Sequence, residues 1–306
     1  MKTHPTPDQK PVTLIHHAAS GPHTSPPNSL TALENCLAAG AAVIEIDAIP
    51  LGDGSFALLH DQDLGAGTTG SGLAPKMARA QIEDFTYLHH GVPTEEKIGF
   101  LDQALILLQR YPETARLQID LKPFTPLTEP VIDQLLALIQ PVINRVQVSS
   151  VADWAVRALA QAAPNLALGF DPLLYIDLVE DQPRPENIPP FRVGAYGLLD
   201  DHPLAAFHWG KQDAYFAARA EALMQLAPAG CQWFIRAQLL KMSLDASFDW
   251  IANLHQHGSA VTGWTIDADQ PSQVALADEL VERGIDCLTT DSPSRLAARL
   301  QTQAVY

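Results

Sequence analysis

Charged side chains stand two residues apart in two apolar segments of this sequence. Glu45 and Asp47 flank an isoleucine in AAVIEIDAI, and Asp120 and Lys122 flank a leucine in LQIDLK. Because strand side chains alternate between faces, both members of each pair point to one side. Two carboxylates aimed at one point repel each other and favour a cation, and oxygen ligands suit Mg²⁺ or Ca²⁺. In isolation such pairs are more often ion pairs or caps of loop amides, so their surroundings decide the interpretation.

Two histidines stand at the ends of neighbouring apolar segments. His16 closes the first strand-like run, and His60 follows LGDGSFALLHD, which is typical of a β-hairpin with an Asp-Gly turn. Phosphodiester cleavage needs one group to accept a proton and one to donate it, and each transfer contributes roughly 10²–10⁴ in rate. With 11 histidines in the chain, a single one is more often held by a backbone carbonyl. Only their joint placement beside the carboxylates favours catalysis.

Alternating strands and helices must position these residues. Between the expected strands lie mostly amphipathic segments of helix length, and the first expected helix is capped by Asn28 or Ser29 and ended by Gly40. No Gly-x-Gly-x-x-Gly follows the first strand, which favours an α/β fold of the (β/α)8 TIM-barrel type over a doubly wound dinucleotide-binding sheet. The expected strands are 12–18, 41–49, 116–121, 145–150, 165–170, 231–236, 260–266 and 286–290.

Two segments interrupt this alternation. Residues 62–100, after the second strand, contain GAGTTGSG and are expected to form a small irregular insertion on the C-terminal rim. Residues 171–230 are rich in proline and hold one more strand-like run, AYGLLDD. We expect residues 1–10 to be a flexible tail and residues 11–306 to be a single domain.

The composition predicts a soluble globular enzyme. Hydrophobic residues make up 47% of the 306 residues and charged residues 18%, which excludes general disorder. The formal charge of -16, without any basic run, argues against nucleic acid and against stable membrane association. The 3 cysteines form no C-x-x-C pair that would indicate a disulfide framework or zinc. With no apolar leader or membrane-spanning segment in the sequence, a cytoplasmic location is expected.

From Leu14 to Pro293 the sequence resembles the glycerophosphodiester phosphodiesterase family. The order of His16, Glu45-x-Asp47 and His60 matches the family's signature. Further family motifs are similar, in the right order, to PPNSL, KIGFLDQAL, LQIDLKP, VQVSS, GWTIDA and GIDCLTTDSP. The resemblance implies an enzyme that hydrolyses a small glycerophosphodiester to sn-glycerol 3-phosphate and an alcohol.

The resemblance also implies a role for each candidate residue. One divalent cation, Mg²⁺ or Ca²⁺, would be held by Glu45, Asp47 and Asp120. The catalytic acid and base, in an order left open, would be His16 and His60. The substrate would be contacted by His17, Lys122 and Trp264, although Trp264 is equally well explained as ordinary core.

Three positions depart from the family. His17 stands where the family has Arg, Pro27 where it has Glu, and Asp120 where the third ligand is usually Glu, as in the sphingomyelinase D-like branch. Arg236, at the end of the sixth expected strand, could supply the missing cation. Two alternatives therefore stay open: a phospholipase D- or sphingomyelinase D-like lipid phosphodiesterase, and a non-catalytic barrel that binds a phosphorylated metabolite. Headgroup and oligomeric state do not follow from the sequence.

Overall fold

Eight parallel strands close into a barrel in the computed structural model, which describes residues 11–21, 24–111, 116–177, 211–301 and 304–306. Each strand pairs with the next, and β1 pairs with both β2 and β11, which closes the sheet. The predicted (β/α)8 barrel and its eight strands are therefore confirmed. The strands are β1 (Val12–His16), β2 (Val43–Pro50), β6 (Arg116–Leu121), β7 (Val146–Ser150), β8 (Ala167–Phe170), β9 (Gln232–Arg236), β10 (Val261–Ile266) and β11 (Cys287–Thr290).

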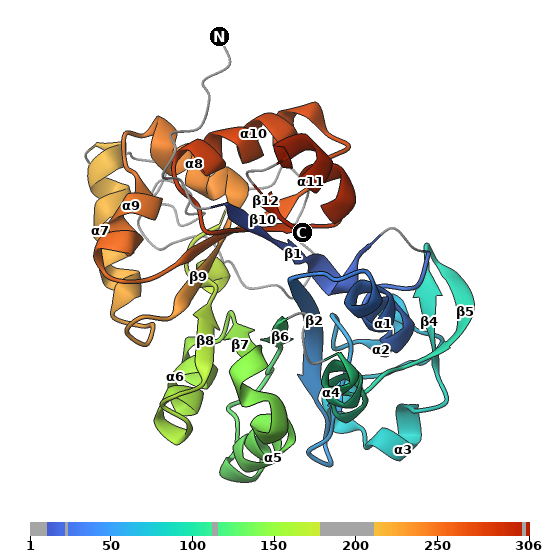
Figure 1. Ribbon diagram of the computed structural model, residues 1–306. Helices are drawn as coiled ribbons and strands as arrows, with labels where there is room; N and C mark the ends of the chain where they lie inside the picture. Colours follow the sequence, from blue (N-terminus) through green and yellow to red (C-terminus); the bar gives the residue numbers. More distant parts are fainter. Residues whose placement is uncertain (1–10, 22–23, 112–115, 178–210, 302–303) are drawn as a thin grey trace.

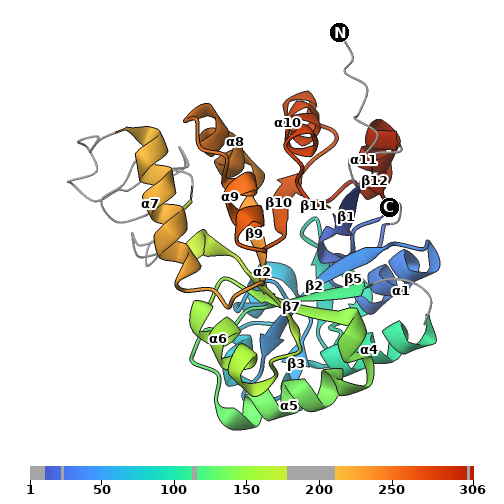
Figure 2. The ribbon, with the colours of Figure 1, turned by 60° about the vertical axis from the view of Figure 1, so that its left-hand side comes forward.

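Helices surround the barrel on the outside, as Figures 1 and 2 show. Their apolar faces pack on the outward side chains of the strands, for example Leu33 and Leu105, both fully buried. Burial of one such side chain stabilises the fold by about 1.5–3 kcal/mol. The outer helices are α1 (Leu30–Ala38), α4 (Leu101–Arg110), α5 (Glu129–Ile139), α6 (Asp153–Ala162), α7 (Gln212–Met224), α8 (Ala237–Asp245), α9 (Trp250–Gln256), α10 (Pro271–Glu282) and α11 (Pro293–Leu300).

The first crossover follows the expected capping signals. Of the two candidate caps for α1, Ser29 is the one used, because its hydroxyl accepts a hydrogen bond from the Ala32 amide. Gly40 follows the helix in the left-handed region, at φ 78, where a side chain would be strained. Short 3₁₀ helices η1 (His17–Ala19), η3 (Gln140–Arg145) and η4 (Pro172–Leu174) and a short strand β12 (Ala304–Val305), paired with β1, complete the barrel.

A hairpin follows β2, as the Asp-Gly turn predicts. β3 (Phe56–Ala57) pairs antiparallel with the end of β2, with Ala57 opposite Ile49. Gly54 takes the left-handed conformation that the turn requires, at φ 84. The hairpin brings the chain back toward the mouth of the barrel, where His60 follows it.

The segment 62–100 is more regular than expected. It contains α2 (Leu64–Gly67), η2 (Ala74–Lys76), α3 (Arg79–Ile82) and the antiparallel hairpin of β4 (Thr86–His89) and β5 (Val92–Lys97), at the right of Figure 1. With the hairpin after β2 it buries a small core of its own. Elements of three to six residues are too short for a clear period, and the side chains of β5 are mostly exposed. For these reasons the sequence pattern did not predict them.

Other expectations fall partly or wholly outside the described residues. Of the proline-rich segment 171–230, the structure describes η4 and the helix α7, whereas the run AYGLLDD lies outside the described part. The tail 1–10 also lies outside it, so the division into a tail and one domain over 11–306 stays a prediction. In the described part of the chain, no helix combines the length and the apolarity needed to cross a bilayer.

Candidate active site

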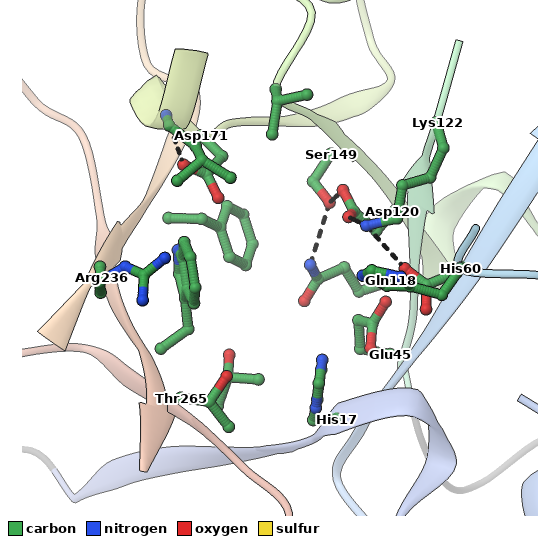
Figure 3. Close-up of a pocket in the computed structure, with 16 residues that line it drawn as sticks. His17, Glu45, His60, Gln118, Asp120, Lys122, Ser149, Asp171, Arg236 and Thr265 are labelled. Atoms are coloured by element: carbon green, nitrogen blue, oxygen red, sulfur yellow. Dashed lines mark hydrogen bonds and ion pairs between the residues drawn. The ribbon is translucent and has the colours of Figure 1, made fainter. Parts of the chain in front are cut away.

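A cavity of about 320 Å³ opens where the carboxyl ends of the barrel strands meet. Alternation sends every second strand side chain into the barrel, so paired strands contribute neighbouring positions. Asp47 on β2 stands opposite Asp120 on β6, and Asp120 stands opposite Ser149 on β7. Figure 3 shows Asp120 on one side of this cavity and Asp171 and Arg236 on the other. The volume suits a small molecule.

Three of the lining carboxylates converge as the sequence predicts. One oxygen from each of Glu45, Asp47 and Asp120 lies within 4.8 Å of the others. Hydrogen bonds fix their orientation: the Ala18 amide donates to Glu45 Oε2 at 2.6 Å, and the Ser149 hydroxyl donates to Asp120 Oδ1 at 3.0 Å. Glu45 and Asp47 are only 3% and 2% exposed. The cluster is therefore rigid and mostly shielded from water.

A single ammonium group lies among these carboxylates. Lys122 Nζ is 2.9 Å from Asp47 Oδ1 and 2.6 Å from Asp120 Oδ2. Although burial opposes it, the ammonium holds the pKa of Asp47 below its ordinary value. Burial and the neighbouring Asp47 raise the pKa of Glu45 to about 8. One lysine thus leaves the three acids undercompensated, and a hard divalent cation with oxygen ligands fits this donor set.

Asn28 holds Asp47 with both ends of its amide, a contact that the sequence pattern did not predict. Its Nδ2 donates to Asp47 Oδ2 at 2.8 Å, and its Oδ1 accepts from the Asp47 backbone amide at 2.9 Å. The residue is 5% exposed and sits in the left-handed region at φ 63, which Asn tolerates well. Its place in the PPNSL motif was the available signal, although capping was the only role that the pattern suggested.

The structure does not bring His16 to this cavity. Its ring is fully buried outside the barrel, where Nδ1 donates to the Ser20 carbonyl at 3.0 Å and the ring meets Tyr306 edge to face at 4.7 Å. Consecutive strand residues face opposite sides, so the next residue, His17, lines the cavity instead. The prediction that His16 lies at the mouth of the barrel is therefore wrong: the next residue in the chain, His17, lies there instead. The side chain that replaces the family's Arg is therefore the imidazole at the site.

His17 is held by a carboxylate from the opposite end of the chain. Its Nδ1 lies 2.6 Å from Oδ1 of Asp291, just after β11. Burial disfavours the charged imidazolium, but the hydrogen bond to Asp291 and the fields of Glu45 and Asp47 outweigh it and raise the pKa of His17 to about 9. His17 is therefore protonated at neutral pH in the metal-free protein. Asp291 lies in the GIDCLTTDSP motif, and the sequence pattern did not predict it as a site residue.

His60 stands at the junction of two cavities. It lines the cavity of the carboxylates and also an adjacent one of about 190 Å³ toward the insertion, beside Pro27 and Tyr87. Its Nδ1 lies 3.2 Å from Asp61 Oδ1, and its side chain is 60% exposed. This exposure leaves the imidazole able to meet a ligand entering from solvent.

An aromatic and a cationic side chain form the far wall. The Arg236 guanidinium lies 4.9 Å from the centre of the Trp264 ring, and its Nε is 2.8 Å from Oδ1 of the buried Asp177. Trp264 thus lines the cavity rather than only the core. Of the predicted site residues, the cavity brings together His17, Glu45, Asp47, His60, Asp120, Lys122, Trp264 and Arg236.

Comparisons with known proteins agree with this fold and site. A model of the glycerophosphoryl diester phosphodiesterase family matches residues 16–295. An Oleispira antarctica phosphodiesterase, solved with the product sn-glycerol-3-phosphate, is 20% identical, with 96% of this chain and 98% of that one covered and a TM-score of 0.65. A glycerophosphodiester phosphodiesterase from Parabacteroides distasonis is 17% identical, with 95% and 100% covered and the same TM-score of 0.65.

At these identities the likeness to solved structures establishes the fold, and the family match carries the assignment. Among curated proteins, none matches the chain significantly. The family match covers nearly the whole barrel and includes the acidic cluster as well as His17, His60 and Lys122. The chain therefore belongs to the glycerophosphoryl diester phosphodiesterase family and is an enzyme of that family.

Proposed function

We propose that the protein hydrolyses glycerophosphodiesters in a metal-dependent reaction that yields sn-glycerol 3-phosphate and an alcohol. The observation that carries the proposal is the convergence of three carboxylates, their ligand atoms within 4.8 Å, in the cavity that also holds His17, His60 and Lys122. A relative of the same fold was solved with sn-glycerol-3-phosphate as its product.

Glu45, Asp47 and Asp120 would hold one divalent cation, Mg²⁺ or Ca²⁺. Oxygen-only ligation suits both ions. When bound, the cation supplies Lewis-acid stabilisation of the charge that develops on the phosphate oxygens. Lys122, beside the same carboxylates, adds a second positive charge toward the phosphate.

The two histidines divide the proton transfers. His17, whose Nδ1 is held 2.6 Å from Asp291 Oδ1, donates a proton to the departing alcohol oxygen. The hydrogen bond to Asp291 helps it to hold that proton. His60 accepts the proton of the neighbouring glycerol hydroxyl as the new oxygen–phosphorus bond forms and the bond to the alcohol breaks. Water then opens the cyclic phosphate: His17, now neutral, takes a proton from water, and His60 returns its proton to the glycerol oxygen. Each imidazole ends the cycle in its starting state.

The test measures the release of glycerol 3-phosphate from glycerophosphocholine by the purified protein, with and without EDTA. We expect EDTA to abolish release, and His17→Ala and His60→Ala each to lower kcat by about 10²–10⁴. His16→Ala is the matched control: it removes the adjacent imidazole, which faces away from the cavity, so its kcat should stay far closer to that of the unmodified protein. Release that survives EDTA, or a larger loss in His16→Ala than in His17→Ala, would refute the proposal.

Several finer expectations are proposals of the same kind. We propose a small-molecule substrate, no nucleic-acid partner, no stable membrane association and a cytoplasmic location, on the strength of the net charge and composition. We also propose that residues 11–306 act as one domain, since the insertion 62–100 packs directly beside β2 and α1 (Figure 1).

A further inference from the structure

Asp171 is a carboxyl in the cavity to which neither the sequence nor the proposed chemistry gives a role. It follows β8, and its backbone amide donates to the Ser150 carbonyl at 3.1 Å, which continues the strand pairing by one residue. Phe170 faces outward and packs edge to face on Trp233 at 5.2 Å, so alternation turns Asp171 inward. Figure 3 shows its carboxyl pointing into the cavity from the side opposite His60 and Glu45.

The carboxyl of Asp171 keeps hydrogen-bonding capacity for a ligand. Its Oδ1 accepts from the Leu173 amide at 2.9 Å, which fixes the side chain. Within the part of the chain that the structure describes, no cation pairs with it, because Lys122 is held by Asp47 and Asp120. Burial, followed by the field of Asp120, raises the pKa of Asp171 well above the ordinary range. The other carboxyl oxygen can accept a hydrogen bond from a hydroxyl group whether or not the carboxyl holds a proton.

The surroundings of Asp171 favour a neutral ligand over a cationic one. The same wall carries the Arg236 guanidinium, stacked 4.9 Å from the Trp264 ring centre, so an ammonium group there would meet a like charge. Phe234 and Leu173 add carbon surface beside it. Apolar carbon next to one hydrogen-bonding carboxyl is complementary to a short polyol chain.

We propose that the wall formed by Asp171, Arg236 and Trp264 binds the terminal glycerol hydroxyl, the one that does not attack phosphorus. This inference rests on the proposed function, and it makes Asp171 a substrate-binding residue that sets specificity. Ligands that lack this hydroxyl, or that carry an acyl group on it, cannot donate a hydrogen bond from it to the carboxyl. The wall thereby favours glycerophosphodiesters with a free terminal hydroxyl over deoxy analogues.

The test compares two ligands by calorimetry in the presence of Ca²⁺: the proposed product, glycerol 3-phosphate, and its analogue propane-1,2-diol 1-phosphate, which lacks only the terminal hydroxyl. We expect the unmodified protein to prefer glycerol 3-phosphate by about 10- to 100-fold, the range that one hydrogen bond to a partly buried carboxyl provides. Asp171→Ala should lower this preference to about one- to threefold, while Asp171→Asn, which retains a hydrogen-bonding amide, should keep most of it. The ratio within one variant does not depend on the fraction of folded protein.

Two outcomes would overturn the inference: a preference near one in the unmodified protein, or a preference unchanged in Asp171→Ala. Binding of phosphocholine is measured as well. If Asp171→Ala binds phosphocholine more weakly than the unmodified protein but binds glycerol 3-phosphate equally well, the wall contacts the headgroup and the inference is wrong. Because binding is measured directly, these results stand apart from the EDTA test. If the protein does not hydrolyse glycerophosphocholine but prefers glycerol 3-phosphate over the analogue, the proposed reaction is refuted and the proposed hydroxyl-binding wall is still supported.

Discussion

Replacing Lys122 by Met tests the electrostatics of the acidic cluster most directly. The change removes two ion pairs at once, 2.9 Å to Asp47 and 2.6 Å to Asp120, and leaves a side chain of similar length. Breaking a buried pair from one side costs about 3–5 kcal/mol. Two features reduce this cost: the lysine is 19% exposed, and the raised pKa of Glu45, about 8, lowers the negative charge that the lysine must compensate. We therefore expect the free energy of unfolding of the metal-free protein at neutral pH to fall by the lower end of the range, about 3 kcal/mol.

The pH dependence of this loss follows from the signs of the pKa shifts. The pKa of Asp47 is lowered in the folded state, so its contribution is present above the ordinary value of 3.8 and disappears as the pH falls through the folded value. The pKa of Lys122 is raised well above 10.5, so its contribution is complete below 10.5 and is lost only at higher pH. The destabilisation of Lys122→Met should therefore be full at pH 7 and shrink below about pH 4.

The assay is equilibrium urea unfolding of the unmodified protein and Lys122→Met, in EDTA and in saturating Ca²⁺. A cation bound by Glu45, Asp47 and Asp120 stabilises the folded state by about 4 kcal/mol at a thousand times its Kd. It should stabilise the variant more, because three uncompensated carboxylates bind it more tightly. The control is Lys241→Met, which removes exposed ion pairs to Asp245 and Glu279. Two results would refute the reasoning. One is a loss of unfolding free energy in Lys122→Met no larger than in this control. The other is a difference between Lys122→Met and the unmodified protein that Ca²⁺ does not reduce.

Two further changes test the segment that carries His17. Ala18 adopts φ 48 and ψ 35, so Ala18→Gly should raise the free energy of unfolding by about 1 kcal/mol in the same urea assay, and destabilisation would contradict the left-handed backbone. Asp291→Asn removes the charge that helps to hold the pKa of His17 near 9, so the pH limb of hydrolysis due to His17 should move to lower pH by about one unit or more. Asp286→Asn, which breaks a similar contact to His255 outside the cavity, should leave the profile unchanged.

The barrel could be predicted because its pattern is long and repeated. Eight apolar runs separated by helix-length segments admit few other folds, and the capping signals at Ser29 and Gly40 placed the first crossover. The convergence of Glu45, Asp47 and Asp120 could be predicted too. Residues two apart in a strand face the same side, and the pairing of β2 with β6 places Asp47 opposite Asp120. Local rules were therefore sufficient for Glu45, Asp47 and Asp120, which lie inside strands with neighbours on both sides.

Expectations failed where a residue lies at the end of a strand or outside it. His16 and His17 differ by one position, and only the register of β1 with its neighbours, which pairs His16 with Thr290 and Ile44, decides which ring faces inward. Asn28 and Asp291 come from loops distant in sequence, so their contacts with Asp47 and His17 carry no local pattern. The short elements of 62–100 were missed because four residues do not establish a period.

The charges around the cavity are the reason that we expect this acidic protein to require a metal to act on a phosphodiester. Among the described residues, the cationic groups that line the cavity are already matched: Lys122 with Asp47 and Asp120, His17 with Asp291, and Arg236 with Asp177. These cations still act on the groups nearest to them, but each is balanced by a carboxylate, so together they give the cavity no excess of positive charge. In the described part of the chain, no cationic side chain forms an ion pair with Glu45. An anionic phosphate meets net attraction only when a divalent cation reverses the sign at the carboxylates. Metal binding should thus precede substrate binding, and glycerol 3-phosphate should not bind measurably in EDTA.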